Sequence, residues 1–118
     1  MSKTDLTPKP LKPAAFHILL ALGDGQSYGY AMMQAVREQS DGQIPLRTGS
    51  FYRHLANLIE AGLIAETAPP RGPVDARRGA YYGLTPRGAR ALAAEKQRLA
   101  DLVESLGGLR RASRKGTA

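Results

Sequence analysis

At residues 48–67 the chain reads TGSFYRHLANLIEAGLIAET, a helix pattern followed by a strand pattern. The apolar side chains of the first part recur at the spacing of one helix face: Phe51, Leu55, Leu58 and Ile59. This spacing predicts an amphipathic helix over residues 48–61, which Thr48 caps or opens. Gly62 is typical of a residue that ends a helix in the left-handed conformation, and residues 63–67 then predict a short strand.

The opposite face of the predicted helix is polar. It presents Arg53, His54 and Asn57, and its first turn adds the hydroxyls of Thr48 and Ser50. The only acidic residue of the helix stands at its far end, so no carboxylate near the N-terminus would repel phosphate. A helix that enters the major groove of DNA needs hydrogen-bonding side chains near its N-terminus. The pattern therefore predicts a recognition helix.

Two more helices are predicted upstream, and with helix 48–61 they make a helix-turn-helix. Residues 14–22 are almost wholly apolar and are followed by the sequence Gly-Asp-Gly, which favours a buried helix with a sharp end. Residues 28–39 show one apolar helical stripe, for which Ser27 is the expected N-cap.

A β-hairpin is predicted downstream. Residues 68–79 are rich in Pro, Gly and Arg and read as a loop, and residues 80–84 read as a return strand that pairs with residues 63–67. Two short strands joined by an Arg-bearing loop, directly after the helices, are the pattern of a wing.

The last predicted helix begins with Thr85 as N-cap and Pro86 at its first position, and it runs to Leu106, before Gly107-Gly108. Its apolar side chains follow a short heptad-like seam: Leu92, Leu99, Leu102, Val103 and Leu106. The seam predicts dimerisation through this helix. It is too short to hold a dimer alone, and the alternative is that the stripe packs on its own domain.

Together these elements predict a mainly α chain with a small β-hairpin: a winged helix-turn-helix with an added C-terminal helix. Residues 13–85 would form the DNA-binding domain and residues 86–106 the dimerisation helix. Residues 1–12 read as a loose arm because prolines block an early helix. Residues 107–118 read as a basic tail without fixed structure.

The charge of the chain points to an anionic partner. Lys and Arg number 17 against 10 Asp and Glu, a formal charge of +7. Much of the excess lies near the two ends, but residues 47–90 are also basic, and every base in that segment is Arg. Arg suits bidentate contacts to phosphate and guanine better than Lys does. The competing interpretation of this segment is a solvated face without a partner.

Several classes of function are excluded or disfavoured. There is no Cys, and the two histidines, His17 and His54, lie far apart, so neither a metal site nor a cofactor site is expected. No nucleophile–base pair, phosphate loop or carboxylate cluster has catalytic spacing, so no catalytic residue and no enzyme activity are predicted. No apolar stretch is long enough to cross a membrane, and no signal peptide is evident, so a cytoplasmic location is expected.

Three stretches of the sequence are similar to PadR-type bacterial transcriptional regulators. They read LLAL at 19–22 leading to YGYAM at 28–32, then GSFYRHL at 49–55 continuing to GLI at 62–64, and RGAYYGLTPRG at 78–88 continuing to AL at 91–92. They occur in the order and spacing of that family. The chain has Phe51 where the family usually has an aliphatic residue and Thr48 where it often has Pro, so base preference cannot be transferred.

The resemblance implies a homodimer that represses genes by binding a palindromic operator on double-stranded DNA. It also implies a small-molecule effector, often aromatic, near the dimer interface. Phe16, Tyr28 and Tyr30 could offer rings to such a ligand, although core packing explains them equally well.

The expected DNA-binding residues lie on the recognition helix and the wing. Arg53, His54 and Asn57 are expected to reach base edges, and Thr48 and Ser50 to meet phosphate. Tyr52 either gives its hydroxyl to a phosphate or is plain core. The wing candidates for backbone contacts are Arg71, Arg77 and Arg78.

Two other functions remain open from the sequence. The winged helix could serve as a protein-interaction module, or the chain could be a basic RNA-binding protein whose tails do the binding.

Overall fold

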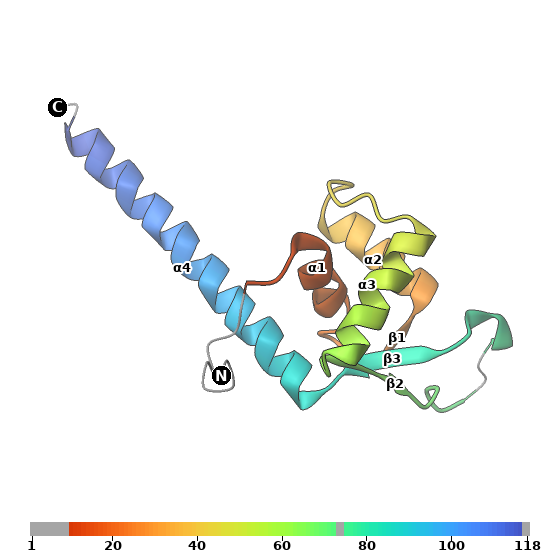
Figure 1. Cartoon of the computed structure of the whole chain (residues 1–118). Coiled ribbons are helices and arrows are strands. Elements are labelled where there is room, and N and C mark those ends of the chain that lie inside the picture. Colours follow the sequence, from red (N-terminus) through yellow and green to blue (C-terminus); the bar gives the residue numbers. More distant parts are fainter. Residues whose placement is uncertain (1–9, 73–74, 117–118) are drawn as a thin grey trace.

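The computed structural model describes residues 10–72 and 75–116, and for residues 108–116 it describes the backbone only. The elements are three short helices, a small sheet and one long helix (Figure 1). In chain order they are α1 (Pro13–Ala21), β1 (Ser27–Tyr28), α2 (Gly29–Gln39), α3 (Thr48–Glu60), β2 (Ile64–Thr67), a 3-10 turn (Ala76–Arg78), β3 (Tyr81–Leu84) and α4 (Pro86–Gly116). The predicted winged helix-turn-helix with a C-terminal helix is confirmed.

The core lies where α1, α2 and α3 meet the sheet and the beginning of α4. Its largest fully buried side chains come from four elements: Ile18, Leu19, Met32, Val36, Phe51 and Ile64. On α3 the buried residues are Phe51, Leu55 and Leu58, as the spacing predicted, whereas Ile59 is exposed. Since this face is held in the core, the polar face of α3 must point outward.

The sheet has three strands rather than the two predicted. Their order is β1-β3-β2, and both pairings are antiparallel, with Ser27 opposite Tyr82 and Ile64 opposite Leu84. The expectation that Ser27 caps α2 is wrong, because its backbone pairs with β3. Tyr28 is the residue that precedes α2, and it makes no side-chain cap hydrogen bond.

The joint between the domain and α4 is closely packed. Thr85 acts as the predicted N-cap, since its hydroxyl accepts from the Gly88 backbone N–H at 3.0 Å and donates to the Gly62 carbonyl oxygen at 2.5 Å. Gly62 follows the end of α3 with a φ of 79°, as expected. Gly88 lies directly against the Leu63 carbonyl, and a Cβ there would overlap that oxygen. This contact sets the direction in which α4 leaves the domain.

The predicted end of the last helix at Leu106 is wrong, because α4 continues through Gly107-Gly108 to Gly116. A glycine inside a helix costs only about 1 kcal/mol relative to alanine, and the residues around this pair are good helix formers. Residues 107–116 are therefore helical rather than without fixed structure. Of the predicted N-terminal arm, residues 1–9 lie outside the described residues.

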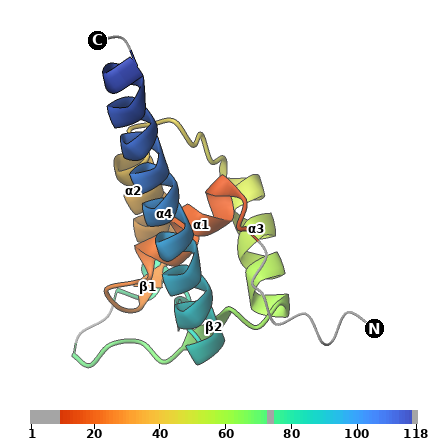
Figure 2. The same cartoon turned by 90° about the vertical axis from the view of Figure 1, so that its left-hand side faces the viewer.

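The assignment of Leu92 to a dimer seam is also wrong. Leu92 is 6% exposed and belongs to the core cluster of its own domain. The reason is that the first turns of α4 pack beside α1, as Figure 2 shows, and only later turns project beyond the domain. The rest of the predicted seam, Leu99, Leu102, Val103 and Leu106, is considered below.

Candidate nucleic-acid interface

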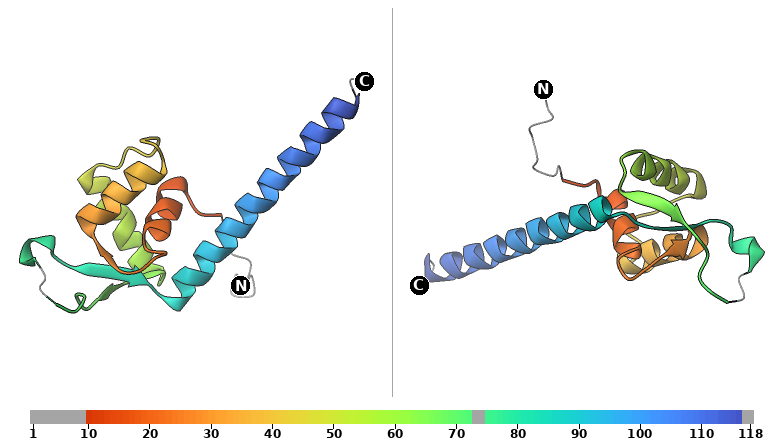
Figure 3. Two further views of the ribbon diagram at one scale, coloured as in Figure 1. Left: turned by 180° about the vertical axis from the view of Figure 1, so that it is seen from behind. Right: turned by 90° about the horizontal axis from the view of Figure 1, so that it is seen from below.

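The N-terminal end of α3 and the wing lie on the same side of the molecule. In Figure 1 both are at the right, and α4 leaves the domain toward the opposite side. The views in Figure 3, from behind and from below, show the same arrangement. The domain thus presents one helix end and one β-hairpin together, away from the long helix.

The outward face of α3 holds the predicted base-reading residues. Arg53 and Asn57 are exposed, and His54 is half-buried. Thr48 is exposed as the first residue of the helix. No acidic residue lies in the first turn and no side chain caps it, so its backbone N–H groups are available to an anion.

Ser50 is placed differently from the other residues of the first turn. It is half-buried, and its hydroxyl donates to the Arg47 carbonyl oxygen at 3.1 Å. Its one O–H is therefore already used, which weakens the expectation that it donates to phosphate. Arg47, which the sequence marks only as one of several charges, is exposed at the N-cap of α3. Its position directly before the first helical residue is the feature that could have identified Arg47 as a candidate DNA-binding residue.

The wing carries its arginines in three different environments. Arg71 is exposed in the loop that follows β2. The side chain of Arg77 is 91% exposed and pairs with Asp75, with Nε 3.2 Å from a carboxylate oxygen. Hydrogen bonds from the Arg77 side chain and backbone N–H hold the pKa of Asp75 below its ordinary value of 3.8. Asp75 therefore stays ionised and ties Arg77 to the 3-10 turn.

Arg78 contacts two tyrosines of the sheet. Its guanidinium donates to the Tyr81 hydroxyl at 3.3 Å and lies 4.9 Å from the centre of the Tyr28 ring. Tyr28 and Tyr81 stand opposite each other in the register of β1 and β3. Because β1 leaves no pattern in the sequence, this cluster could not be expected from the sequence either.

Tyr52 is more exposed than a core residue, at 47%, and its ring packs edge-on against Phe51. It lines a hollow between the wing and the N-terminal ends of α2 and α3, of about 430 Å³. We call this the tyrosine hollow; its lining residues are Tyr28, Tyr30, Tyr52, Asp75, Arg77 and Arg78. The structure thus brings Tyr52, Arg77 and Arg78 together, and it leaves Arg71 apart from them.

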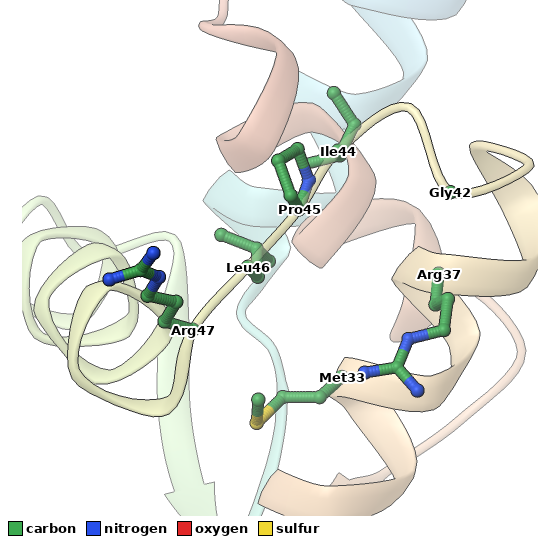
Figure 4. A pocket seen from close by; sticks show the side chains of 7 residues that line it. All are labelled: Met33, Arg37, Gly42, Ile44, Pro45, Leu46 and Arg47. Atoms are coloured by element: carbon green, nitrogen blue, oxygen red, sulfur yellow. The ribbon is translucent and has the colours of Figure 1, made fainter.

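A second hollow, of about 270 Å³, lies between α2 and the segment that leads into α3 (Figure 4). Arg37 and Arg47 stand on opposite sides of it, and Met33, Ile44 and Leu46 supply apolar surface. None of the predicted DNA-binding residues lines it.

Other kinds of site find no support in the described part of the chain. Within residues 10–72 and 75–116, no three His, Asp or Glu residues gather as a metal ion would require. In the same ranges no helix is both long and apolar enough to pass through a bilayer.

Comparison with protein families gives one match of wide coverage. The model of the transcriptional regulator PadR-like family matches residues 18–94, more than half of the chain. The chain belongs to this family. Members of the PadR-like family are DNA-binding regulators of transcription and not enzymes, so the protein is a DNA-binding regulator, as the sequence predicted.

Several solved structures share the fold, and two of those named here are PadR family or PadR-like regulators. A PadR family regulator from Clostridium difficile R20291 aligns with a TM-score of 0.69 at 23% identity, over 83% of this chain and 98% of its own. A PadR-like regulator from Bacillus cereus aligns with a TM-score of 0.64 at 24% identity, over 80% and 88%. RosR from H. salinarum gives 0.61 at 21% identity, over 87% and 96%. A search of curated proteins finds no significant match in sequence.

Proposed function

We propose that this PadR-like protein is a homodimeric repressor that binds a palindromic operator, with α3 of each subunit in the major groove. The observation that carries the proposal is the exposed polar end of α3 beside the arginine-bearing wing, on the side away from α4 (Figure 3). A major groove about 12 Å wide admits one helix, and a hairpin beside the helix then meets the flanking backbone.

The residues of this face divide into two roles. Arg53, His54 and Asn57 reach base edges, because they lie on the outward face of the helix that enters the groove. Thr48, the N–H groups of the first turn, and Arg71 and Arg77 on the wing meet phosphates, which fix position without reading sequence. Arg47 joins this second group, since it is exposed next to the same N–H groups.

The part of α4 that projects beyond the domain supports the proposed dimer. Leu102, Val103 and Leu106 are 49%, 68% and 61% exposed, and Leu99 is half-buried on the same helix. Apolar side chains grouped on a helix that extends beyond its own domain are typical of an interface. Two copies joined there would present two α3 helices to one duplex, as a palindromic operator requires.

The repressor role and the small-molecule effector rest on the family alone. A dimer whose two α3 helices must match successive major grooves would lose affinity if a ligand at the α4 interface changed their separation. Family membership favours sequence-specific DNA binding over the two alternatives, a protein-interaction module and an RNA-binding protein.

Selection of bound sequences from a random duplex pool tests the proposal. We expect a palindrome whose half-sites are about 10 base pairs apart, centre to centre. An Arg53→Ala, Asn57→Ala variant should recover no such motif. Recovery of a motif without two-fold symmetry, or of no motif by the wild type, would contradict the proposal.

Deletion of residues 107–118 distinguishes a protein that binds through α3 in the major groove (a groove reader) from one that binds through its basic C-terminal tail (a tail-driven binder). The groove reader keeps its preference for the selected operator over a scrambled duplex, whereas a tail-driven binder loses most of its affinity for both. A truncated chain should be checked by sedimentation, because α4 extends into the deleted segment.

A further inference from the structure

Every tyrosine of the chain lies at the junction between the wing and the helix-turn-helix. Tyr28, Tyr30 and Tyr52 line the tyrosine hollow, and the ring of Tyr81 lies 5.5 Å from that of Tyr28. The fifth, Tyr82, follows on β3 opposite Ser27. The chain has five tyrosines and no tryptophan. The phenol hydroxyls of the chain are therefore concentrated in one place.

Three of the acceptor groups around the hollow are engaged within the protein. The Asp75 carboxylate accepts three hydrogen bonds from Arg77, two from the side chain and one from the backbone. The Tyr81 oxygen accepts from Arg78, and the Tyr30 oxygen accepts from the Gln34 amide at 3.0 Å. The lining thus holds no carboxylate that is not already paired, because Asp75 is its only acid.

The side chains around the hollow offer a ligand several hydrogen-bond donors. The Tyr30 oxygen already accepts, so its O–H is left to donate outward. The Tyr52 hydroxyl makes no hydrogen bond with the residues that the structure describes, and Arg77 and Arg78 keep N–H groups beyond those used above. Several donors around one opening, with a net positive charge from two arginines and one aspartate, suit an anion that has more than one oxygen.

We propose that the tyrosine hollow is a phosphate subsite that receives one backbone phosphate of the bound DNA, between the groove entered by α3 and the wing. The Tyr30 and Tyr52 hydroxyls and Arg77 bind the phosphate oxygens. Arg78 acts as a positioning residue, because its contacts with Tyr28 and Tyr81 hold the wing against the sheet. This inference rests on the proposed DNA-binding mode.

The backbone of a duplex is favoured over a free phosphorylated molecule by the place of the hollow. The residues that line it come from the wing and from the N-terminal ends of α2 and α3. Since α3 and the wing stand on the same side of the molecule (Figure 1), a duplex held by both elements would pass beside these residues. Tyr52 lies one residue from Arg53, which ties the subsite to the helix that reads the bases.

Gly29 explains how the Tyr52 hydroxyl reaches this position. The hydroxyl lies over Gly29 at the start of α2, and a Cβ at that residue would overlap it. Gly29→Ala should therefore displace the Tyr52 hydroxyl from the hollow while leaving the hydroxyl on the protein. Alanine suits a helix better than glycine, so a loss of binding in this variant would not come from a weaker α2.

The test is a double-variant cycle between protein and DNA. We expect Tyr52→Phe and Tyr30→Phe each to weaken binding about tenfold, equally for operator and scrambled duplex, because a hydrogen bond to a charged group is lost. Neutral methylphosphonates are then placed singly along the operator. One position should weaken the wild type by a similar factor and weaken Tyr52→Phe no further.

The outcomes separate the subsite from the proposed function. If the wild type selects an operator, but Tyr52→Phe binds it unchanged and all methylphosphonates act additively, the inference is overturned and the DNA-binding mode stands. If tyrosine fluorescence responds to inorganic phosphate while the cycle is additive throughout, the hollow takes free phosphate and the DNA assignment is wrong. If no operator is selected but the cycle on a fixed duplex shows coupling, the subsite is supported and the proposed operator reading fails.

Discussion

Individual residues at the interface differ in what they contribute, and variants can tell the roles apart. Arg53→Ala should cost about 1–3 kcal/mol of binding free energy on the selected operator and relax the base preference at one position. Arg77→Ala should weaken all duplexes alike and lower the slope of log affinity against log salt by about 1. Quantitative binding titrations at several salt concentrations measure both effects. A loss of base preference in Arg77→Ala, with none in Arg53→Ala, would reverse the assignment.

Gly88 is the residue on which the α4 joint depends most. Because a Cβ at this position meets the backbone of Leu63, Gly88→Ala should lower the free energy of unfolding by about 2–3 kcal/mol. Urea denaturation measures this loss. Gly49→Ala is the matched control, since nothing lies near its Cβ position within 4 Å, and it should be neutral or stabilising. Equal stability of the two variants would show that α4 can shift without cost.

Glu95 gives the stability of the α4 joint a dependence on pH. It is 5% exposed, and Arg98 donates to both carboxylate oxygens. The hydrogen bonds from Arg98 hold the pKa of Glu95 below its ordinary value of 4.5. A lowered folded-state pKa stabilises the protein above that ordinary value, and the stabilisation is lost as the pH falls through the folded pKa.

Glu95→Gln should therefore be less stable than the wild type at neutral pH, and the difference should shrink below pH 4.5. Thermal unfolding followed between neutral and acidic pH measures the two curves. A difference that is constant over this range would show that the charge of Glu95 contributes nothing.

At the scale of elements, α4 serves two purposes along its length. Its first turns complete the core through Leu92, and its later turns expose Leu102, Val103 and Leu106. Leu102→Glu with Leu106→Glu should give a monomer by sedimentation at micromolar concentration and much weaker operator binding, since only one half-site is held at a time. Gln97→Glu, which adds the same charge on the opposite face of the helix, should remain dimeric. A double variant that is still dimeric would place the interface elsewhere.

The elements are predictable where the sequence carries a local signal. The turn glycines, the Thr85-Pro86 start and the apolar spacing of residues 51–58 predict the order of helices and the hairpin. β1 cannot be predicted because two residues have no periodicity, and it exists only through its pairing with β3. The assignment of Leu92 fails because core packing and a dimer seam use the same spacing. Gly107-Gly108 predicts a stop, although the helix continues past it.

The sequence predicts only part of the candidate site, because some of the elements that form the site leave no local pattern. The outward face of α3 follows from helix periodicity alone, so Arg53 and Asn57 can be named and are exposed. The tyrosine hollow depends on β1, on the 3-10 turn and on the missing side chain at Gly29, none of which leaves a local pattern. Its residues come from three parts of the chain that only the tertiary fold brings together.

At the scale of the whole molecule, phosphate contacts from both subunits should make binding strongly dependent on salt. With three or four contacts per subunit, the slope of log affinity against log salt should be about −5 to −7 for the dimer. Operator titrations between low and moderate salt measure it. A flat dependence would mean that the wing and the first turn of α3 do not meet phosphates.

In the proposed complex, two α3 helices occupy successive major grooves of one duplex. Methylation protection of guanine N7, an atom that faces the major groove, tests it most directly on the selected operator. We expect two protected patches about 10 base pairs apart, both lost in the Arg53→Ala, Asn57→Ala variant. Binding without protection in the major groove, or a single protected patch at saturation, would contradict it.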